Sequence, residues 1–520
     1  MLSPARLLLL ALLPLLTHCA SAPRLDGIVA THAVPPGRST TLDQVMLKDL
    51  GDEPGVSAIR LLELNSMAFA YRSATAEAAE RTLDVQYYIW HEDFTGKLLA
   101  SELMRAAERG VRVRVLVDDV DARAKHDLFA VADLHPRIEV RIFNPFYSRS
   151  GLLGQVSEYV LRGSRLNHRM HNKAWIADNR VAIIGGRNIG DEYFGASPHS
   201  NFSDLDLVVS GPIVHEVSAS FDEYWNSRNA VPVSRFDRKR PEPGALGRLI
   251  ESAREFREEA GESDYIEALR DVKRRAELLA QQAPPLRVKH IELLVDEPSK
   301  VGTDKSGVRA SRVLTGIAAT ARDAREELLI VSPYFVPRKR GAQGLVEAVE
   351  RGMRVAVLTN SLAATDVAAV HTGYARYRRQ LLRGGVEIYE MKRKAGSAEG
   401  RHQISVTGSS GASLHTKAMV IDQRWAYIGS MNLDPRSADL NMEMGVLVES
   451  PELAAQLREQ FERTTSPELS YRVVMEKGEG LVWYDEVRGQ KRRLEREPDA
   501  SVWRRLAVTL LRALPIESQL

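Results

Sequence analysis

The chain has 520 residues, of which 44% are hydrophobic and 27% are charged, so we expect a globular protein of two or three domains. The 71 Lys and Arg residues nearly balance the 69 Asp and Glu residues, and a net charge of +2 gives no support to a protein that wraps nucleic acid. The single cysteine, Cys19, excludes a disulfide framework and a zinc site built from several cysteines. No run of about 18 apolar residues follows residue 20, which excludes a polytopic membrane domain.

The N-terminus has the pattern of a secretory signal, with an arginine followed by the apolar run Leu7–Leu16. The sequence Leu16-Thr-His-Cys19 resembles a bacterial lipoprotein box, although His18 departs from the small residue that usually precedes the cysteine. We expect residues 1–18 to be removed and Cys19 to be lipidated. Cleavage a few residues further on and an uncleaved anchor are the alternatives. All three place the protein at a membrane, and we expect it to be lipid-anchored and to face the periplasm.

Two stretches of the chain repeat one pattern, most clearly in Glu108-Arg-Gly-Val-Arg-Val and Glu350-Arg-Gly-Met-Arg-Val. In chain order, the predicted elements are a strand at 83–90, a helix at 97–109, strands at 111–117 and 138–143, a strand at 329–335, a helix that ends near 350, and strands at 353–359 and 386–391. Each half contains a βαβ unit, which requires a partly parallel sheet. We therefore predict an α/β fold of two pseudo-symmetric lobes, each a mixed sheet flanked by helices.

The domain boundaries follow from this repeat. We predict a signal segment at 1–18, a first lobe at 45–234, a helical linker at 235–285, a second lobe at 286–465 and a C-terminal extension at 466–520. The linker is rich in charge and is expected to be a solvated outer face. Residues 502–514 of the extension mix Trp and Leu with Arg, which indicates either an interfacial helix at a membrane or a helix packed on the second lobe.

Each lobe carries the pattern H-x-K-x4-D followed by G-[GS]-x-N. The residues of this pattern are His171, Lys173, Asp178 and Asn188 in the first lobe and His415, Lys417, Asp422, Ser430 and Asn432 in the second. In a strand, residues two apart face the same side, so we expect each His to project beside its Lys. An imidazole beside a fixed cation suits an anionic phosphodiester, whose oxygens the lysines, the two asparagines and the serine can hold.

Two facing lobes would place two imidazoles on either side of one phosphorus, in one active site between the lobes. One His would attack as nucleophile, and the other would protonate the leaving alkoxide. A monomer is sufficient for such a site. We expect no metal ion and no cofactor in this reaction, because two lysines and two asparagines neutralise and orient the phosphate.

Each imidazole needs a carboxylate to fix its tautomer. Matching the proline after each final strand places Asp204 opposite Glu443 in the repeat. We therefore expect Asp204 to orient His171 and Glu443 to orient His415, with Asp206 as the competitor of Asp204.

These motifs are the signature of the phospholipase D superfamily, and the resemblance covers nearly the whole chain after the signal segment. The run Asn432-Leu-Asp-Pro-Arg-Ser437 with Asn441-Met-Glu443 resembles the second motif of bacterial cardiolipin synthases. The segments Gln86–Trp90, His168–Lys173 and Leu514–Leu520 are similar to the C-type branch of that family.

The resemblance implies a phosphatidyltransferase that forms cardiolipin from phosphatidylglycerol and a second phospholipid through a phosphohistidine. It implies that His171 is the nucleophile, and that Asp178 and Asp422 at hairpin tips are mainly structural members of the motif. The expected partners are phospholipids and a membrane surface, without nucleic acid. A hydrolytic phospholipase D stays open, while a nucleic-acid phosphodiesterase and a non-catalytic lipoprotein are less favoured. His371 is either a headgroup-binding residue or a surface residue.

Overall fold

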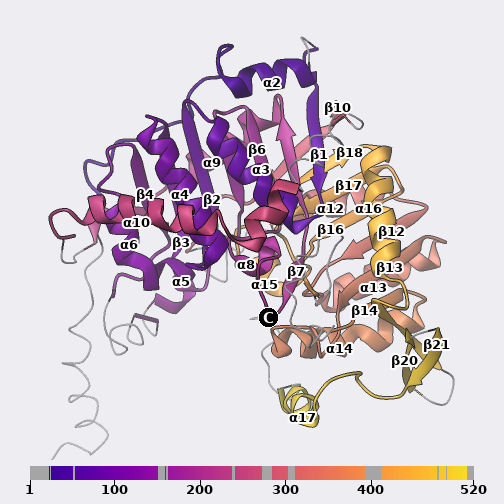
Figure 1. Ribbon diagram of the computed structural model, residues 1–520. Helices are drawn as coiled ribbons and strands as arrows, with labels where there is room; N and C mark the ends of the chain where they lie inside the picture. Colours follow the sequence, from indigo (N-terminus) through magenta and orange to yellow (C-terminus); the bar gives the residue numbers. More distant parts are fainter. Residues whose placement is uncertain are drawn as a thin grey trace, which may run out of the picture.

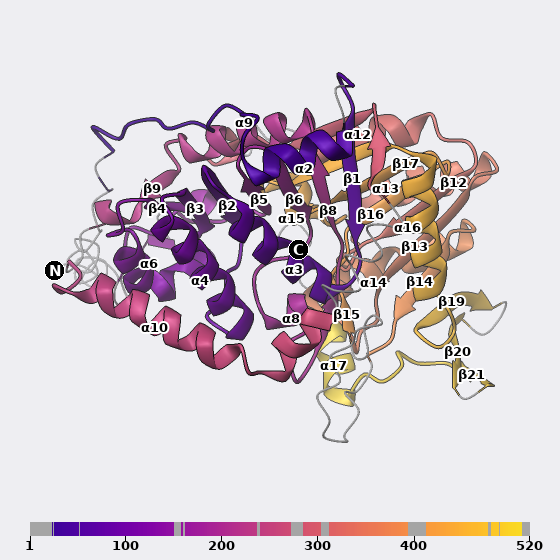
Figure 2. The ribbon, with the colours of Figure 1, turned by 45° about the horizontal axis from the view of Figure 1, so that its top comes forward.

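The computed structural model describes residues 23, 25–50, 53–149, 158–159, 162–236, 240–271, 284–302, 311–393, 412–476, 480–487 and 489–511. The signal segment, Cys19 and residues 514–520 of the sequence analysis lie outside these residues. Two large mixed sheets, each with helices on its outer face, form two lobes side by side (Figures 1 and 2), which confirms the predicted fold class. Among the described residues, no helix combines the length and the apolar character that crossing a membrane requires.

The first lobe is built on a nine-stranded sheet. Its strands, in spatial order, are β10 (Leu286–Val288), β1 (Ser57–Leu62), β8 (Asp206–Ser210), β6 (Val181–Gly185), β5 (Ala174–Ala177), β2 (Thr82–Tyr87), β3 (Arg112–Asp118), β4 (Ile138–Phe143) and β9 (Ala230–Pro232). Strands β2, β3 and β4 are parallel, and the other pairs are antiparallel. The predicted βαβ unit is therefore present at the centre of the sheet.

The second lobe repeats this arrangement in a ten-stranded sheet. Its strands, in spatial order, are β11 (Ile291–Val295), β18 (Met444–Glu449), β17 (Trp425–Gly429), β16 (Ala418–Ile421), β12 (Glu327–Val331), β13 (Arg354–Asn360), β14 (Glu387–Met391), β19 (Ser470–Glu476), β20 (Gly480–Val487) and β21 (Gln490–Leu494). Strands β12, β13 and β14 are the parallel ones, in the places of β2, β3 and β4. A small separate sheet pairs β7 (Asn201–Ser203) of the first lobe with β15 (Ala412–Leu414) of the second.

Helices complete both lobes. Those of the first lobe and linker are α2 (Thr41–Leu50), α3 (Asn65–Ala78), α4 (Phe94–Glu108), α5 (Asp119–Ala122), α6 (His126–Ala132), α8 (Asp191–Phe194), α9 (Ile213–Trp225) and α10 (Ala245–Ala260). Those of the second are α12 (Arg312–Arg322), α13 (Arg338–Glu350), α14 (Ala368–Arg383), α15 (Pro435–Asp439), α16 (Pro451–Thr464) and α17 (Val502–Leu511). Asp93 caps α4 by accepting a hydrogen bond from the Gly96 N–H.

The hydrophobic core has three parts. The inner faces of both sheets pack with α9 and α16 into one cluster that joins the lobes. The outer face of the first sheet packs with α3 and α4, and that of the second packs with α12, α13 and α14. Because apolar surface of both lobes is buried in one shared cluster, the two motifs are held at a rigid seam.

The structure moves two of the predicted boundaries. Strand β10 starts at Leu286, where we expected the second lobe to begin, yet it pairs with β1 in the sheet of the first lobe. The predicted C-terminal extension supplies β19, β20 and β21 to the second sheet, and Tyr471 and Trp483 are buried in the core of that lobe. Edge strand β14 thereby gains an antiparallel neighbour, which covers its unpaired backbone groups. Within the linker, α10 and residues 264–271 are helical, and α10 packs on α4 and α6.

Candidate active site

Both H-x-K segments lie at the seam between the lobes, in extended chain just before β5 and β16 rather than inside these strands. The backbone N–H of His171 donates to the Met442 carbonyl at 2.8 Å. In the equivalent place, the N–H of His415 donates to the Ser203 carbonyl at 2.9 Å. The second bond continues the parallel pair of β7 and β15, which come from opposite lobes.

Because of these two backbone bonds, each motif histidine contacts a carboxylate of the opposite lobe. His171 Nδ1 lies 2.8 Å from Glu443 Oε2, and His415 Nδ1 lies 2.6 Å from Asp204 Oδ2. Asp204 and Glu443 thus contact imidazoles, but our prediction that each serves the His of its own lobe is wrong. The reason is the backbone pairing, because Glu443 directly follows Met442 and Asp204 directly follows Ser203. The competitor Asp206 is bonded to Arg72 at 2.9 Å instead.

The two carboxylates set the tautomer of the two imidazoles. Burial by itself raises the pKa of Asp204, but Lys417 and His415 outweigh it and hold that pKa below its usual value. The pKa of Glu443 is lowered in the same way by His171 and Lys173 against the effect of burial. An ionised carboxylate only accepts hydrogen bonds, so Nδ1 of His171 carries the proton that faces Glu443, and its Nε2 keeps a free lone pair. His415 Nδ1 faces Asp204 in the same way, and it also lies 2.8 Å from Lys417 Nζ.

Burial keeps both imidazoles neutral in the unliganded site. It lowers the pKa of His171 to about 4, with Glu443 opposing the shift and Lys173 adding to it. The pKa of His415 is also lowered, first by burial and then by Lys417. Lys417 also lowers the pKa of His171, and Lys173 that of His415, so each imidazole is influenced by the lysine of the other lobe. The two clusters therefore act as one electrostatic unit.

The two lysines are buried beside the imidazoles. Lys173 Nζ donates to the His171 carbonyl at 2.6 Å, and Lys417 Nζ donates to the His415 carbonyl. Burial lowers the pKa of Lys173 far below its usual value and that of Lys417 to about 8. An anion bound in this cluster would favour the charged form of both lysines and raise their pKa values again.

Three residues predicted to hold phosphate oxygens are placed differently from one another. Asn188 accepts from the Ile89 N–H at 3.3 Å and donates to Tyr193 Oη at 3.0 Å, so its amide is engaged within the first lobe. Ser430 donates to Glu443 Oε2, so it acts on the carboxylate rather than directly on a phosphate. The buried Oδ1 of Asn432 has no hydrogen-bond partner among the described residues. Asn432 therefore stays a candidate for binding the substrate.

Asp178 and Asp422, which complete the predicted motif, hold hairpins rather than imidazoles. Asp178 accepts hydrogen bonds from the N–H groups of residues 80–82, and Asp422 accepts from those of residues 325–327. Both have positive φ, 52° and 51°, at the tips of the β5–β6 and β16–β17 hairpins. These bonds support the mainly structural role that the resemblance implies for the two carboxylates.

Aromatic rings that the sequence analysis did not select surround the imidazoles. The Tyr88 ring centroid is 5.0 Å from that of His171, and those of Tyr193 and Phe202 are 5.3 Å and 5.0 Å from that of His415. Tyr88 lies within the predicted strand at 83–90, although no role was predicted for it, and nothing in the sequence distinguishes Phe202. His371 is buried, with Nε2 at 3.4 Å from Glu497 Oε1, so the alternative of a surface residue is wrong.

The crossed pairing predicts which imidazole responds to which carboxylate. Glu443→Gln removes the charge that raises the pKa of His171, so the pKa of His171 should fall further while that of His415 changes less. Asp204→Asn should lower the pKa of His415 and change that of His171 less. Histidine-selective ¹⁵N NMR of the two variants would measure both rings, and in each variant the other imidazole is the internal control. A larger response of His415 to Glu443→Gln would contradict the pairing.

Comparisons with known proteins identify relatives of the chain. Residues 73–225 and 317–465 match the family model described as cardiolipin synthase, PLD-like domain. Over 476 residues the chain is 40% identical to cardiolipin synthase C of Escherichia coli strain K12, which covers 92% of this chain and 99% of that protein. It is 26% identical to cardiolipin synthase B of the same strain, over 77% of this chain and 78% of that one.

A solved structure shares the fold over both lobes. The crystal structure of phosphatidylserine synthase from Haemophilus influenzae Rd KW20 matches with a TM-score of 0.56 at 14% identity, covering 89% of this chain and 95% of that chain. With the family match over both repeats and the 40% identical relative, the chain belongs to the cardiolipin synthase family of phospholipase D-like proteins.

Proposed function

We propose that the protein is a phosphatidyltransferase that forms cardiolipin from phosphatidylglycerol and a second phospholipid. The observation that carries this proposal is the pair of buried imidazoles, one from each lobe, each oriented by a buried carboxylate of the other lobe. The relative of 40% identity is a cardiolipin synthase, and the match covers nearly the whole of both chains. Buried lysines beside both imidazoles suit a phosphodiester substrate.

The first step forms a phosphohistidine. His171 Nε2 attacks the phosphorus of the donor lipid, the bond from phosphorus to the headgroup oxygen breaks, and His415 gives its Nε2 proton to the leaving alkoxide. In the second step, His415 takes the proton of a phosphatidylglycerol hydroxyl as its oxygen attacks the same phosphorus. The phosphorus–nitrogen bond then breaks, and His171 regains its lone pair.

The charges of the site explain how His415 can carry the proton that the first reaction step needs. When both lysines are charged, they balance Asp204 and Glu443, so a phosphodiester brings one unmatched negative charge. One additional proton on an imidazole restores the balance. The anion thus raises the pKa of the imidazole that has to donate, although burial keeps both rings neutral before the substrate enters.

The reaction is tested by product analysis. Purified protein in mixed micelles should convert phosphatidylglycerol to cardiolipin, and released glycerol or ethanolamine identifies the donor when phosphatidylethanolamine is added. His171→Ala and His415→Ala should each lower turnover by ~100-fold or more, because each removes a reacting group. Phosphatidic acid as the sole product would identify a hydrolase and contradict the proposed transfer to a lipid hydroxyl.

The roles of the two imidazoles are separable with an activated donor. A p-nitrophenyl ester of phosphatidic acid has a leaving group that needs no proton, so His415→Ala should still form a covalent adduct in a burst. His171→Ala should form none, because it lacks the attacking nitrogen. Acid-quench mass spectrometry locates the adduct. A label on His415 would exchange the roles, and the absence of any label together with inversion at phosphorus would contradict the covalent step.

Membrane attachment belongs to the same proposal. We place the protein at the outer face of a bacterial membrane, anchored through lipidated Cys19 and facing the periplasm. Helix α17 supports a second contact, because Val502, Trp503 and Leu510 are 73%, 79% and 65% exposed. The helix contacts α14, with Val508 buried against Leu362 and Ala368. Arg504 also donates to the Thr365 carbonyl. An exposed Trp and Leu face suits the interface of a bilayer.

Vesicle binding tests the contact through α17. In a Cys19→Ser background, Trp503→Ser combined with Leu510→Ser should lower the partition onto phosphatidylglycerol-containing vesicles by at least ~10-fold, because burial of each large apolar side chain contributes ~1.5–3 kcal/mol. Val29→Ser, which changes an equally exposed residue far along the chain from α17, should have no effect. Flotation or cosedimentation measures this partition. Equal binding of both variants would exclude the contact.

A further inference from the structure

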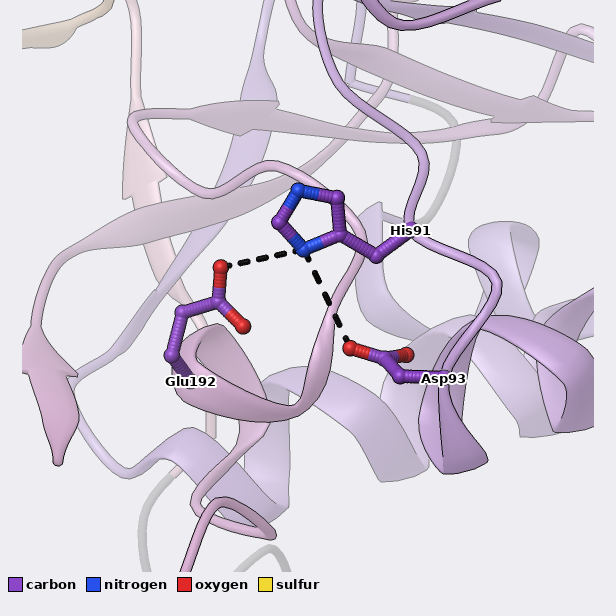
Figure 3. Close-up of side chains that lie close together, drawn as sticks. All are labelled: His91, Asp93 and Glu192. Atoms are coloured by element: carbon purple, nitrogen blue, oxygen red, sulfur yellow. Dashed lines mark ion pairs between the residues drawn. The ribbon is translucent and has the colours of Figure 1, made fainter. Parts of the chain in front are cut away.

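Three side chains of types that bind metal ions, His91, Asp93 and Glu192, lie close together outside the active site. His91 Nδ1 lies 3.1 Å from Glu192 Oε1 and 3.9 Å from Asp93 Oδ2, and Figure 3 shows both carboxylates turned toward this nitrogen. One ligand atom from each residue lies within 4.8 Å of the other two. Tetrahedral zinc with bonds of ~2.1 Å places its ligand atoms about 3.4 Å apart. The two distances from the imidazole lie on either side of this value.

Gly190 leaves space at the point where the three groups meet. A Cβ added to Gly190 would lie 2.9 Å from His91 Nδ1, 3.2 Å from Glu192 Oε2 and 3.3 Å from Asp93 Oδ2. A side chain at this position would therefore occupy the volume that the three side chains face. The close approach of the three groups at this point therefore depends on glycine at position 190.

The surrounding groups orient Asp93 as a ligand. Asp93 Oδ2 accepts from the Asp191 N–H at 2.7 Å, and Oδ1 accepts from the Gly96 N–H at 3.0 Å. Hydrogen bonds of this kind hold a ligating carboxylate in place. Asp93 and Glu192 place two carboxylates at close range around one imidazole nitrogen. A divalent cation would offset their repulsion.

We propose that His91, Asp93 and Glu192 bind a divalent transition-metal cation of the Zn²⁺ type. An imidazole nitrogen with two carboxylate oxygens is a ligand set for zinc rather than for Mg²⁺ or Ca²⁺, which prefer oxygen alone. The side chains are 22–38% exposed, so water completes the coordination. This site is separate from the reacting imidazoles and does not depend on the proposed reaction.

The cation acts on the surroundings of His415. It ties the loop after Trp90 to α8, and Tyr193 on α8 packs against the His415 ring. Tyr193 Oη also accepts the hydrogen bond from Asn188. The two loops are already joined by the bond from the His91 N–H to the Ile189 carbonyl at 2.9 Å. The cation therefore stabilises one wall of the active site.

Zinc binding to the tag-free full chain tests the proposal by calorimetry and by metal analysis after dialysis. Wild-type protein should bind one Zn²⁺ at this site, and binding should be at least ~10-fold weaker in His91→Ala, Glu192→Gln and Gly190→Ala. Gly190→Ala keeps all three ligands and only fills the space between them. The matched control is His32→Ala, because His32 Nδ1 lies 3.6 Å from the single carboxylate of Asp222.

Thermal unfolding provides a second readout. Zn²⁺ should raise the melting temperature of the wild type and of His32→Ala, a chelator should reverse the rise, and the three site variants should respond less. Equal zinc affinity in His91→Ala would place the metal elsewhere in the chain. No zinc binding by the wild type would leave His91 as the protonated partner of two carboxylates. Either result overturns the proposal, and neither bears on cardiolipin formation.

Discussion

The active centre depends on two backbone hydrogen bonds that cross from one lobe to the other. In each, the N–H of a motif histidine binds a carbonyl of the opposite lobe, and the next residue there supplies the carboxylate for that histidine. Neither lobe alone contains a motif histidine together with the carboxylate that orients it. The duplication therefore produces one shared site whose assembly depends on the seam, where apolar side chains of both lobes form a common cluster.

The two halves of this site hold their orienting carboxylates with different side chains. Glu443 is the longer carboxylate, and Ser430 holds it from the side by a hydrogen bond. Asp204 is shorter and lies against Gly186, where an added Cβ would be 2.2 Å from Asp204 Oδ1. The second residue of the G-[GS] pair, Gly186 or Ser430, thus contacts the carboxylate of its own lobe. Through that carboxylate it supports the imidazole of the other lobe.

Charge burial explains why so many polar groups gather at the seam. An isolated buried ion is costly, whereas lysines and carboxylates buried together stabilise one another. Lys417 and Asp204 illustrate this balance. Burial lowers the pKa of Lys417 and Asp204 raises it, whereas burial raises the pKa of Asp204 and Lys417 lowers it. The same set leaves both imidazoles neutral, which is the state that a nitrogen nucleophile needs.

The sequence by itself determined the repeat, the βαβ units, the two histidines and lysines, and the identity of both orienting carboxylates. These follow from local periodicity and from spacing, because residues two apart in extended chain project to the same side. Tertiary structure alone decided that Asp204 serves His415 and Glu443 serves His171, since this pairing arises from backbone contacts between segments more than 200 residues apart. It also decided that β10 joins the first sheet and that residues after 466 extend the second, because an edge strand takes its neighbour from whichever segment the folded chain brings beside it. The same holds for Phe202 beside His415 and for His91 facing Glu192, where the contact depends on the positions of distant loops and leaves no periodic signal in the chain.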